Sequence, residues 1–306
     1  MKTIIILRDR YDDPMKYSID HYIVRWRTAG YRVLDHIGPK DVPAGDLVVV
    51  HIDASVIPRE YLDVINRFPK SINGRILDIS RRNYSQILLS EADNYTGPAL
   101  VKTNANYGGS PEYETKRPIR YRSMIAAGKV PSLIEIATQT PRILKNRLIR
   151  LGGKLWKRIS PPNWRTLETL NPYQYPVFEN IESVPTGVWD NPHLVVEKFL
   201  GGEENGLYTS YYYVFFGDKE IAGRLRAPNP MVKFTTCVED IEIPVPEIVR
   251  EWRRELQIDL GRFDFLEQDG QFFLIDVNKT EGGGAANDQY AEAFDYLAAG
   301  LEDFLD

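Results

Sequence analysis

Three polar residues stand at fixed places in a predicted β-hairpin near the end of the chain. Asp264 lies inside the first arm, and Asp276 and Asn278 close the second. Residues two apart on a strand point to the same side, and the turn at residues 269–270 (Asp-Gly) is a strong hairpin signal, so the fold brings all three together. Carboxylate and amide oxygens are hard ligands of the kind that Mg²⁺ takes beside substrate phosphates. An ordinary solvent-facing hairpin is the alternative interpretation, and motifs upstream favour the metal site.

A lysine and a glycine loop follow an earlier predicted strand. Lys102 ends the strand over residues 99–102, and Gly108 and Gly109 lie in the loop behind it. Glycines let backbone N–H groups approach phosphate oxygens, and a lysine adds a point charge. The spacing is not that of a Walker A loop. Taken alone, a Gly-Gly loop is more often just a turn.

A third motif is a strand that runs into an acidic loop, with Glu197, Lys198, Phe199 and Leu200 followed by Glu204. The main chain of such a hinge can bind an adenine ring, and a carboxylate can bind ribose hydroxyls. An edge strand with solvated acids is the alternative.

Two arginines form the fourth motif. Arg224 and Arg226 are two apart on a predicted strand and share a face, with Lys233 further on. They are either solvated or placed to neutralise phosphate charge.

In this order, the motifs resemble the ATP-grasp superfamily, and the D-alanine–D-alanine ligases most clearly in the last segment. There the pattern Arg-x-Asp, strand, turn, strand, acid-x-Asn, then Gly recurs. The resemblance covers about residues 75–306. It implies an α/β N-terminal domain over residues 1–78 and an α+β ATP-grasp fold, whose two lobes clasp ATP. The central lobe with a basic helical insertion would span residues 79–196, and the C-terminal lobe residues 197–306.

The resemblance also implies roles, carried over position by position. The implied ATP ligands are Lys102, Gly108, Gly109, Glu197, Lys198, Phe199, Leu200, Glu204 and Arg82. The implied Mg²⁺ ligands are Asp264, Asp276 and Asn278. The implied catalytic cations are Arg262, which matches the arginine that steadies the oxyanion in those ligases, and the hairpin residues Arg224 and Arg226.

Four departures from the family pattern stand out. Arg81 and Arg82 occupy the place where a lysine is usual, and Asp276 stands where Glu is commoner. The next phosphate-binding lysine has three candidates, which are Arg224, Arg226 and Lys233. The interval between Lys102 and Glu197 is longer than usual and therefore contains an insertion.

The implied reaction is ATP- and Mg²⁺-dependent ligation of a carboxylate to an amine through an acyl phosphate. The partners would be small-molecule or peptide substrates that the sequence does not identify. Two alternatives stay open, a small-molecule kinase with the same fold and a nucleotide-binding protein without turnover. His51, Asp53, Ser55 and Asn73 follow predicted strands of the N-terminal domain, where substrate contacts are expected.

Composition excludes several other classes of protein. The 306 residues carry a net charge of −5, which argues against general nucleic-acid binding. One cysteine excludes a disulfide framework and fits a reducing cytoplasm, and the four histidines show no metal-ligand spacing. No apolar run reaches the ~18 residues of a membrane span, and the N-terminus reads as a buried strand rather than a signal peptide.

The predicted insertion contains Arg142–Arg158, which is strongly basic, has no acid and carries an apolar stripe. It would either contact an anionic surface or substrate, or form a packed helix with its charges in water. Whether the chain forms a homodimer is also left open.

The elements that position these motifs follow from periodicity. Strands are expected at residues 3–7, 31–37, 46–52, 75–78, 99–102, 194–199, 208–216 and 219–225, and in the hairpin arms of 261–278. Helices are expected at residues 18–29, 58–68, 81–89, 246–256 and 287–305. Alternating strands and helices in residues 1–80 predict a parallel sheet. Phe273, Ile275 and Val277 should form one apolar face of the last arm.

Overall fold

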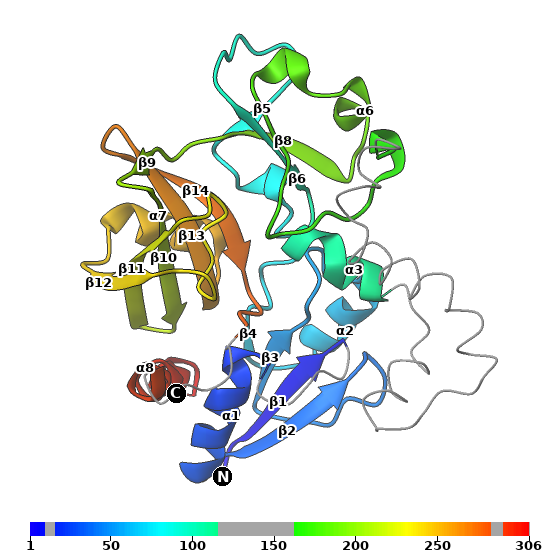
Figure 1. Ribbon diagram of the computed structural model, residues 1–306. Helices are drawn as coiled ribbons and strands as arrows, with labels where there is room; N and C mark the ends of the chain where they lie inside the picture. Colours follow the sequence, from blue (N-terminus) through cyan, green and yellow to red (C-terminus); the bar gives the residue numbers. More distant parts are fainter. Residues whose placement is uncertain (10–15, 116–161, 283–289, 306) are drawn as a thin grey trace, which may run out of the picture.

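Three β-sheets organise the chain in the computed structural model, which describes residues 1–9, 16–115, 162–282 and 290–305 (Figure 1). The first sheet is parallel, and the other two are antiparallel. This confirms the predicted fold class, an α/β unit at the N-terminus followed by two α+β lobes.

The N-terminal sheet has the strand order β2-β1-β3-β4. Its strands are β1 (Thr3–Arg8), β2 (Arg32–Ile37), β3 (Leu47–His51) and β4 (Ser71–Ile72). The helices of this unit are α1 (Ser18–Thr28) and α2 (Leu62–Ile65). The fourth strand was misplaced at residues 75–78, because the short β4 pairs before that segment and Asp78 forms only an isolated bridge with Val56.

The central sheet has the order β5-β8-β6-β7. Its strands are β5 (Leu88–Leu89), β8 (Leu194–Lys198), β6 (Ala99–Thr103) and β7 (Val177–Phe178), and the short helices α3 (Ser110–Thr115) and α6 (Thr186–Trp189) belong to the same part of the chain. The predicted helix over residues 81–89 is wrong. Only one 3₁₀ turn forms at Arg81–Asn83, because the main chain of Gln86 and Ile87 bonds to other strands instead.

The C-terminal sheet has the order β12-β11-β10-β13-β14, with β9 on β10. Its strands are β9 (Glu203–Glu204), β10 (Leu207–Phe216), β11 (Lys219–Ala227), β12 (Glu239–Ile243), β13 (Leu260–Gln268) and β14 (Gln271–Asn278). The helix α7 (Glu247–Leu256) packs on one face through Val249 and Trp252. Because β8 continues to Lys198, we propose that the boundary between the lobes lies after residue 198 rather than after 196, with 78/79 kept as the other boundary.

A β-bulge interrupts the pairing of β13 with β14. Asp264 lies opposite Asp276, but Phe265 lies opposite Leu274, so Ile275 is an extra residue. A bulge shifts the alternation of faces by one position. The predicted apolar face of Phe273, Ile275 and Val277 is therefore wrong. Leu274 and Val277 are buried against the aromatic core, whereas Ile275 turns toward a cavity.

The last helix of the chain packs against the first one. Helix α8 (Ala291–Ala298) and the 3₁₀ turns of Ala299–Phe304 lie beside α1 (Figure 1), where the Trp26 indole N–H donates to the Ala298 carbonyl at 2.9 Å. One apolar core contains residues of α1, the N-terminal sheet, β10 and α8. The expected start of this helix at 287 and the basic segment Arg142–Arg158 lie outside the described residues. Among the helices described, none has the length and apolarity to cross a membrane.

Asn73 joins the N-terminal unit to the C-terminal lobe. Its side chain is fully buried, accepts from the Asp259 and Leu260 N–H groups at 2.9 and 3.1 Å, and donates to the Leu260 carbonyl at 2.7 Å. Its backbone has a φ of 60°, which asparagine tolerates better than most residues. The substrate contact expected at this position is thus replaced by a structural bond.

We predict that Asn73→Ala lowers the free energy of unfolding by about 2–4 kcal/mol, because two N–H groups of the main chain lose their acceptor in a buried place. Chemical denaturation of the intact chain measures the change. Asn66→Ala, on the exposed side of the same unit, is the matched control. A loss no larger in Asn73→Ala than in the control would contradict this structural role.

Candidate nucleotide and metal site

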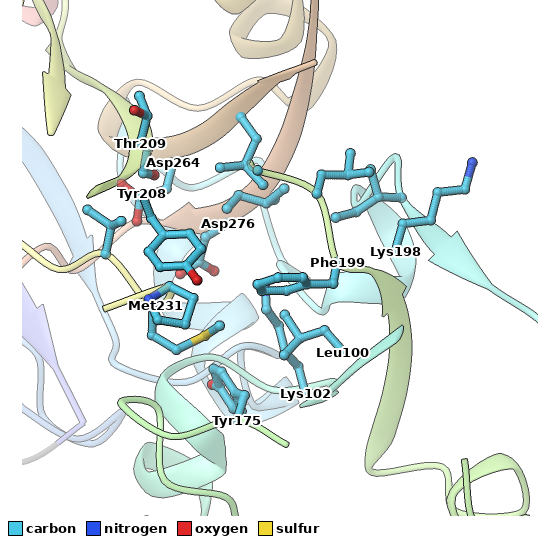
Figure 2. Close-up of a pocket in the computed structure, with 18 of the residues that line it drawn as sticks. Leu100, Lys102, Tyr175, Lys198, Phe199, Tyr208, Thr209, Met231, Asp264 and Asp276 are labelled. Atoms are coloured by element: carbon cyan, nitrogen blue, oxygen red, sulfur yellow. The ribbon is translucent and has the colours of Figure 1, made fainter. Parts of the chain in front are cut away.

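A cavity lies between the central and C-terminal sheets (Figure 2). It holds about 720 Å³ of space, including the part open to solvent. The charged residues that line it are Arg81, Lys102, Lys198, Lys233, Asp264 and Asp276. Its larger apolar and aromatic lining residues include Leu100, Tyr175, Phe199, Leu200, Tyr208 and Met231.

Six of the predicted site residues line this one cavity. They come from β6, from the end of β8 and the loop after it, and from β13 and β14, and they are Lys102, Lys198, Phe199, Leu200, Asp264 and Asp276. Sequence positions more than 170 apart are thus brought to a single place. In Figure 2 the amine of Lys198 extends away from the other labelled side chains, so the main chain of this residue is the part suited to a ligand.

Glu204, Arg224 and Arg226 line a neighbouring pocket, which shares Gly201 and Thr209 with the cavity. Arg224 Nη2 lies 3.1 Å from Glu239 Oε1, and Arg226 Nη2 donates to the Glu204 carbonyl at 3.0 Å. Both arginines therefore have acidic or carbonyl partners beside the cavity rather than in it.

Three further predicted residues lie away from the cavity. Arg82 is exposed and donates to the Leu194 carbonyl at 2.7 Å. Gly108 and Gly109 are buried with φ of 66° and 73°, and a Cβ on them would come within 2.1 Å of the Leu170 carbonyl oxygen and 2.5 Å of the Glu168 carbonyl oxygen. Glycine is needed there because two stretches of main chain pack closely.

Glu197 forms a buried ion pair with Lys102, the lysine that lines the cavity. Lys102 Nζ lies 2.8 Å from Glu197 Oε2, and Ser85 donates to the other carboxylate oxygen at 2.7 Å. Burial lowers the pKa of Lys102, and the facing carboxylate opposes that shift. Glu197 was predicted to frame an adenine; its side chain is fully buried in this pair and does not line the cavity.

The two carboxylates of the hairpin each have a cationic partner. Arg262 Nε donates to Asp264 Oδ1 at 2.8 Å, and Arg81 Nη1 lies 3.0 Å from Asp276 Oδ1. Burial acts to raise the pKa of Asp276, but the charges of Arg81, Lys233 and Lys102 outweigh it and lower that pKa. Asp276 is therefore a carboxylate at neutral pH.

Asn278 shares the sheet face of these acids and lies opposite Arg262 in the register. Its Oδ1 already accepts the Thr280 N–H at 2.9 Å, and it does not line the cavity. Across the described ranges, no group of three or more His, Cys, Asp or Glu side chains could hold a metal. Two carboxylates nevertheless fit Mg²⁺, which typically uses one or two of them with waters and substrate phosphates.

Sequence reasoning missed several lining residues. Arg81 was passed over for Arg82, because an irregular turn gives no periodicity to choose between neighbours. Lys233 was one of three candidates, and its place in the cavity now distinguishes it from Arg224 and Arg226. Tyr175 lies in a segment without regular elements between residues 167 and 176, where no sequence signal would have found it.

A buried lysine directly follows β14. Lys279 is 2% exposed, and in the described part of the chain its Nζ has no hydrogen-bond partner. Burial lowers the pKa of Lys279 to about 8, against the opposing charges of Asp53, Asp78, Asp9 and Glu112. Asp9 and Asp53 directly follow the strands β1 and β3, so Lys279 ties the N-terminal unit electrostatically to the hairpin.

Comparison with known proteins gives structural matches only. No protein-family model and no curated protein matches the chain. A D-alanine–D-alanine ligase from Bacillus anthracis aligns over 100% of this chain and 96% of its own, at 11% identity and a TM-score of 0.49. A RimK-domain ATP-grasp protein from Sphaerobacter thermophilus aligns over 99% and 100%, at 9% identity and a TM-score of 0.47.

A RiPP-associated ATP-grasp ligase from Chryseobacterium gregarium aligns over 98% of this chain and 97% of its own, at 11% identity and a TM-score of 0.40. At such identities and TM-scores the similarity carries no argument about activity. The assignment of function depends on how this chain arranges its own residues.

We predict a pH-dependent contribution of Lys279 to stability. Between pH about 8 and 10.5 the folded chain has released this proton while the unfolded chain still binds it. Stability rises with pH wherever the unfolded state binds more protons. The unfolding free energy of the protein should therefore rise relative to that of Lys279→Met, by on the order of 3 kcal/mol across this window.

Denaturant titrations of both proteins across the window measure the difference. Lys40→Met, which removes an exposed lysine of the N-terminal unit, is the control and should show no such trend. Parallel curves for the protein and Lys279→Met at all pH values would show that the lysine keeps an ordinary pKa.

Proposed function

We propose that the chain is a ligase of the ATP-grasp superfamily, which uses ATP and Mg²⁺ to join a carboxylate to an amine. The observation that carries the proposal is the single cavity between two antiparallel sheets. It combines a strand-end hinge at Lys198–Leu200, a buried cation at Lys102 and two opposed carboxylates at Asp264 and Asp276. These are the parts that a bound nucleoside triphosphate and its metal require.

The apolar end of the cavity suits a purine. Leu100, Phe199 and Met231 line it, and a flat ring gains from burial against such side chains. The Leu200 N–H donates to the Lys198 carbonyl at 3.1 Å within a tight turn. A purine edge would replace this bond. An acceptor of the purine would receive the Leu200 N–H, and a donor of the purine would bond to the Lys198 carbonyl.

The polar end of the cavity suits phosphates. Lys102 supplies positive charge from β6 of the central sheet and Lys233 from the segment between β11 and β12, and both act on the pKa of Asp276. Mg²⁺ held by Asp264 and Asp276 would supply Lewis-acid stabilisation of charge on the phosphate oxygens. The chain's own residues orient the triphosphate and neutralise its charge, as phosphoryl transfer requires.

The proposed reaction has two steps. A substrate carboxylate oxygen attacks the γ-phosphorus, and the bond to the β-phosphate oxygen breaks to give ADP and an acyl phosphate. An amine then attacks the acyl carbon, loses a proton, and inorganic phosphate leaves. Arg262 is proposed to steady the oxyanion of the second step. Its guanidinium lies against Asp264 and 3.6 Å from Glu281, beside the hairpin carboxylates.

Incubation with Mg·ATP and panels of amino acids, peptides and other amines tests this function. A ligase yields ADP, free phosphate and a product whose mass equals both substrates minus water. A product heavier by a phosphoryl group, with no free phosphate, would identify a kinase instead. No ATP consumption with any pair, together with nucleotide binding, would indicate a binding protein without turnover.

We predict that Asp276→Asn lowers turnover at least about 100-fold, or about 2.7 kcal/mol of transition-state stabilisation. The amide keeps the shape of the side chain but removes the charge that holds the metal. Phosphate release under saturating ATP measures the effect, and a thermal melt checks the fold.

Asp269→Asn makes the same chemical change in the exposed turn of the same hairpin and should keep full turnover. Equal turnover in both variants would remove Asp276 from the site.

A further inference from the structure

A single guanidinium connects the two lobes at the metal site. Arg81 lies in the 3₁₀ turn between the N-terminal unit and the central sheet, with its side chain 3% exposed. Its Nε donates to the Thr103 carbonyl at the end of β6 at 3.1 Å. Its Nη1 donates to the Ile275 carbonyl on β14 at 2.8 Å and lies 3.0 Å from Asp276 Oδ1.

The bulge in β14 makes this connection available. Ile275 is the extra residue, and the extra residue of a bulge is left out of the ladder, so its carbonyl needs another donor. A planar guanidinium has five N–H groups in a fixed fork and reaches two carbonyls and a carboxylate at once. A lysine would supply the charge without this geometry. Arg81 therefore fixes the position of Asp276 relative to both sheets.

Counting oxygens shows what remains for a metal. Asp276 Oδ1 receives Arg81 and the Tyr84 hydroxyl, the latter at 3.1 Å. Asp264 Oδ1 receives Arg262. Within the described ranges, no side chain or main-chain group donates to the Oδ2 atom of either acid. The pair thus offers one uncommitted oxygen from each carboxylate.

Fixed cations already surround the two acids. Two guanidinium groups face the two carboxylates, the Lys102 ammonium is paired with Glu197, and Lys233 adds a further positive charge at the cavity. Two divalent ions about 3.5–4 Å apart would both need protein oxygens. Each acid already has one oxygen occupied, Asp264 Oδ1 by Arg262 and Asp276 Oδ1 by Arg81 and the Tyr84 hydroxyl.

We propose that this site binds one divalent cation, and that Arg81 is a positioning residue whose fixed charge occupies the place a second ion would need. The cation would take the free oxygens of Asp264 and Asp276 together with nucleotide phosphates. This inference rests on the proposed function of the same cavity, and it concerns the number of metal ions rather than the reaction.

Titration with Mn²⁺ in the presence of a non-hydrolysable ATP analogue tests the proposal, with free Mn²⁺ counted by electron paramagnetic resonance. We expect one Mn²⁺ per chain for the unaltered protein. Two nucleotide-dependent Mn²⁺ ions per chain would overturn the proposal and leave the proposed function intact. Absence of any nucleotide-dependent Mn²⁺ binding would overturn both.

Variants at Arg81 separate its charge from its shape. Arg81→Gln removes the positive charge beside Asp276 Oδ1 and leaves only the neutral Tyr84 hydroxyl there, so the count should rise from one Mn²⁺ to two. Arg81→Lys keeps the charge, so the count should stay at one. Arg82→Gln, at the exposed neighbour, is the matched control and should leave both count and affinity unchanged.

A single Mn²⁺ with unchanged affinity in Arg81→Gln would contradict the role of Arg81. If that variant does not fold, Tyr84→Phe provides a milder change, because it removes one hydroxyl from Asp276 Oδ1 and leaves the guanidinium. It should keep one Mn²⁺, with affinity changed by less than about threefold, since a fixed charge outweighs one neutral hydrogen bond. A second Mn²⁺ in Tyr84→Phe would show that the hydroxyl, and not Arg81, limits the count.

Discussion

Six charged side chains in and beside the cleft are largely removed from water, and a buried charge needs a counter-charge at short range. An unpaired buried ion costs several kcal/mol, whereas a well-placed pair recovers much of that cost. The cleft contains three such pairs, which are Lys102–Glu197, Arg81–Asp276 and Arg262–Asp264. The pair Arg81–Asp276 crosses between the lobes. The same side chains that suit a nucleotide and its metal therefore also hold the lobes in place.

The two halves of the cleft are attached to the rest of the molecule in different ways. The N-terminal unit and the C-terminal lobe share one apolar core, reinforced by Asn73 and by the bond from Trp26 to Ala298. The central sheet has an apolar core of its own. It meets β14 through polar bonds, including Asn106 Nδ2 to the Val277 carbonyl at 2.7 Å.

The sequence was sufficient for features that depend on strict alternation. Strand periodicity placed Asp264 and Asp276 on one face, and the register puts them opposite one another. The prediction from periodicity failed at the next residue along β14. A bulge leaves no signal in the composition, and here it reversed the expected faces of Ile275 and Leu274. The choice between Arg81 and Arg82 failed for a related reason. Both stand in a 3₁₀ turn, where only the contacts with distant strands decide which side chain turns inward.

At three other predicted site residues, the structure shows a second use of the same residue type. Gly108 and Gly109 were read as a phosphate loop, yet their main chain packs against residues 168–170. Glu197 was read as a nucleotide contact, yet it is buried beneath Lys102. Both uses need the same residue, since glycine allows close approach of any neighbour and a carboxylate pairs with any cation. Only tertiary contacts separate them, and those come from segments far away in the sequence.

The strand that carries the candidate metal ligands is fixed from both sides. Arg81 holds it at the Ile275 carbonyl. Beyond the strand end, Thr280 donates through its N–H to Asn278 Oδ1 and through its hydroxyl to Asp53 Oδ1 at 2.9 Å. Asp53 in turn accepts the Tyr17 hydroxyl at 2.7 Å. A site that stabilises charge on phosphate oxygens gains most when its dipoles and charges need not reorganise during the reaction. The bonds from Arg81 and from Asp53 of the N-terminal unit hold β14 rigid. These two residues therefore support the site, although neither is a candidate metal ligand.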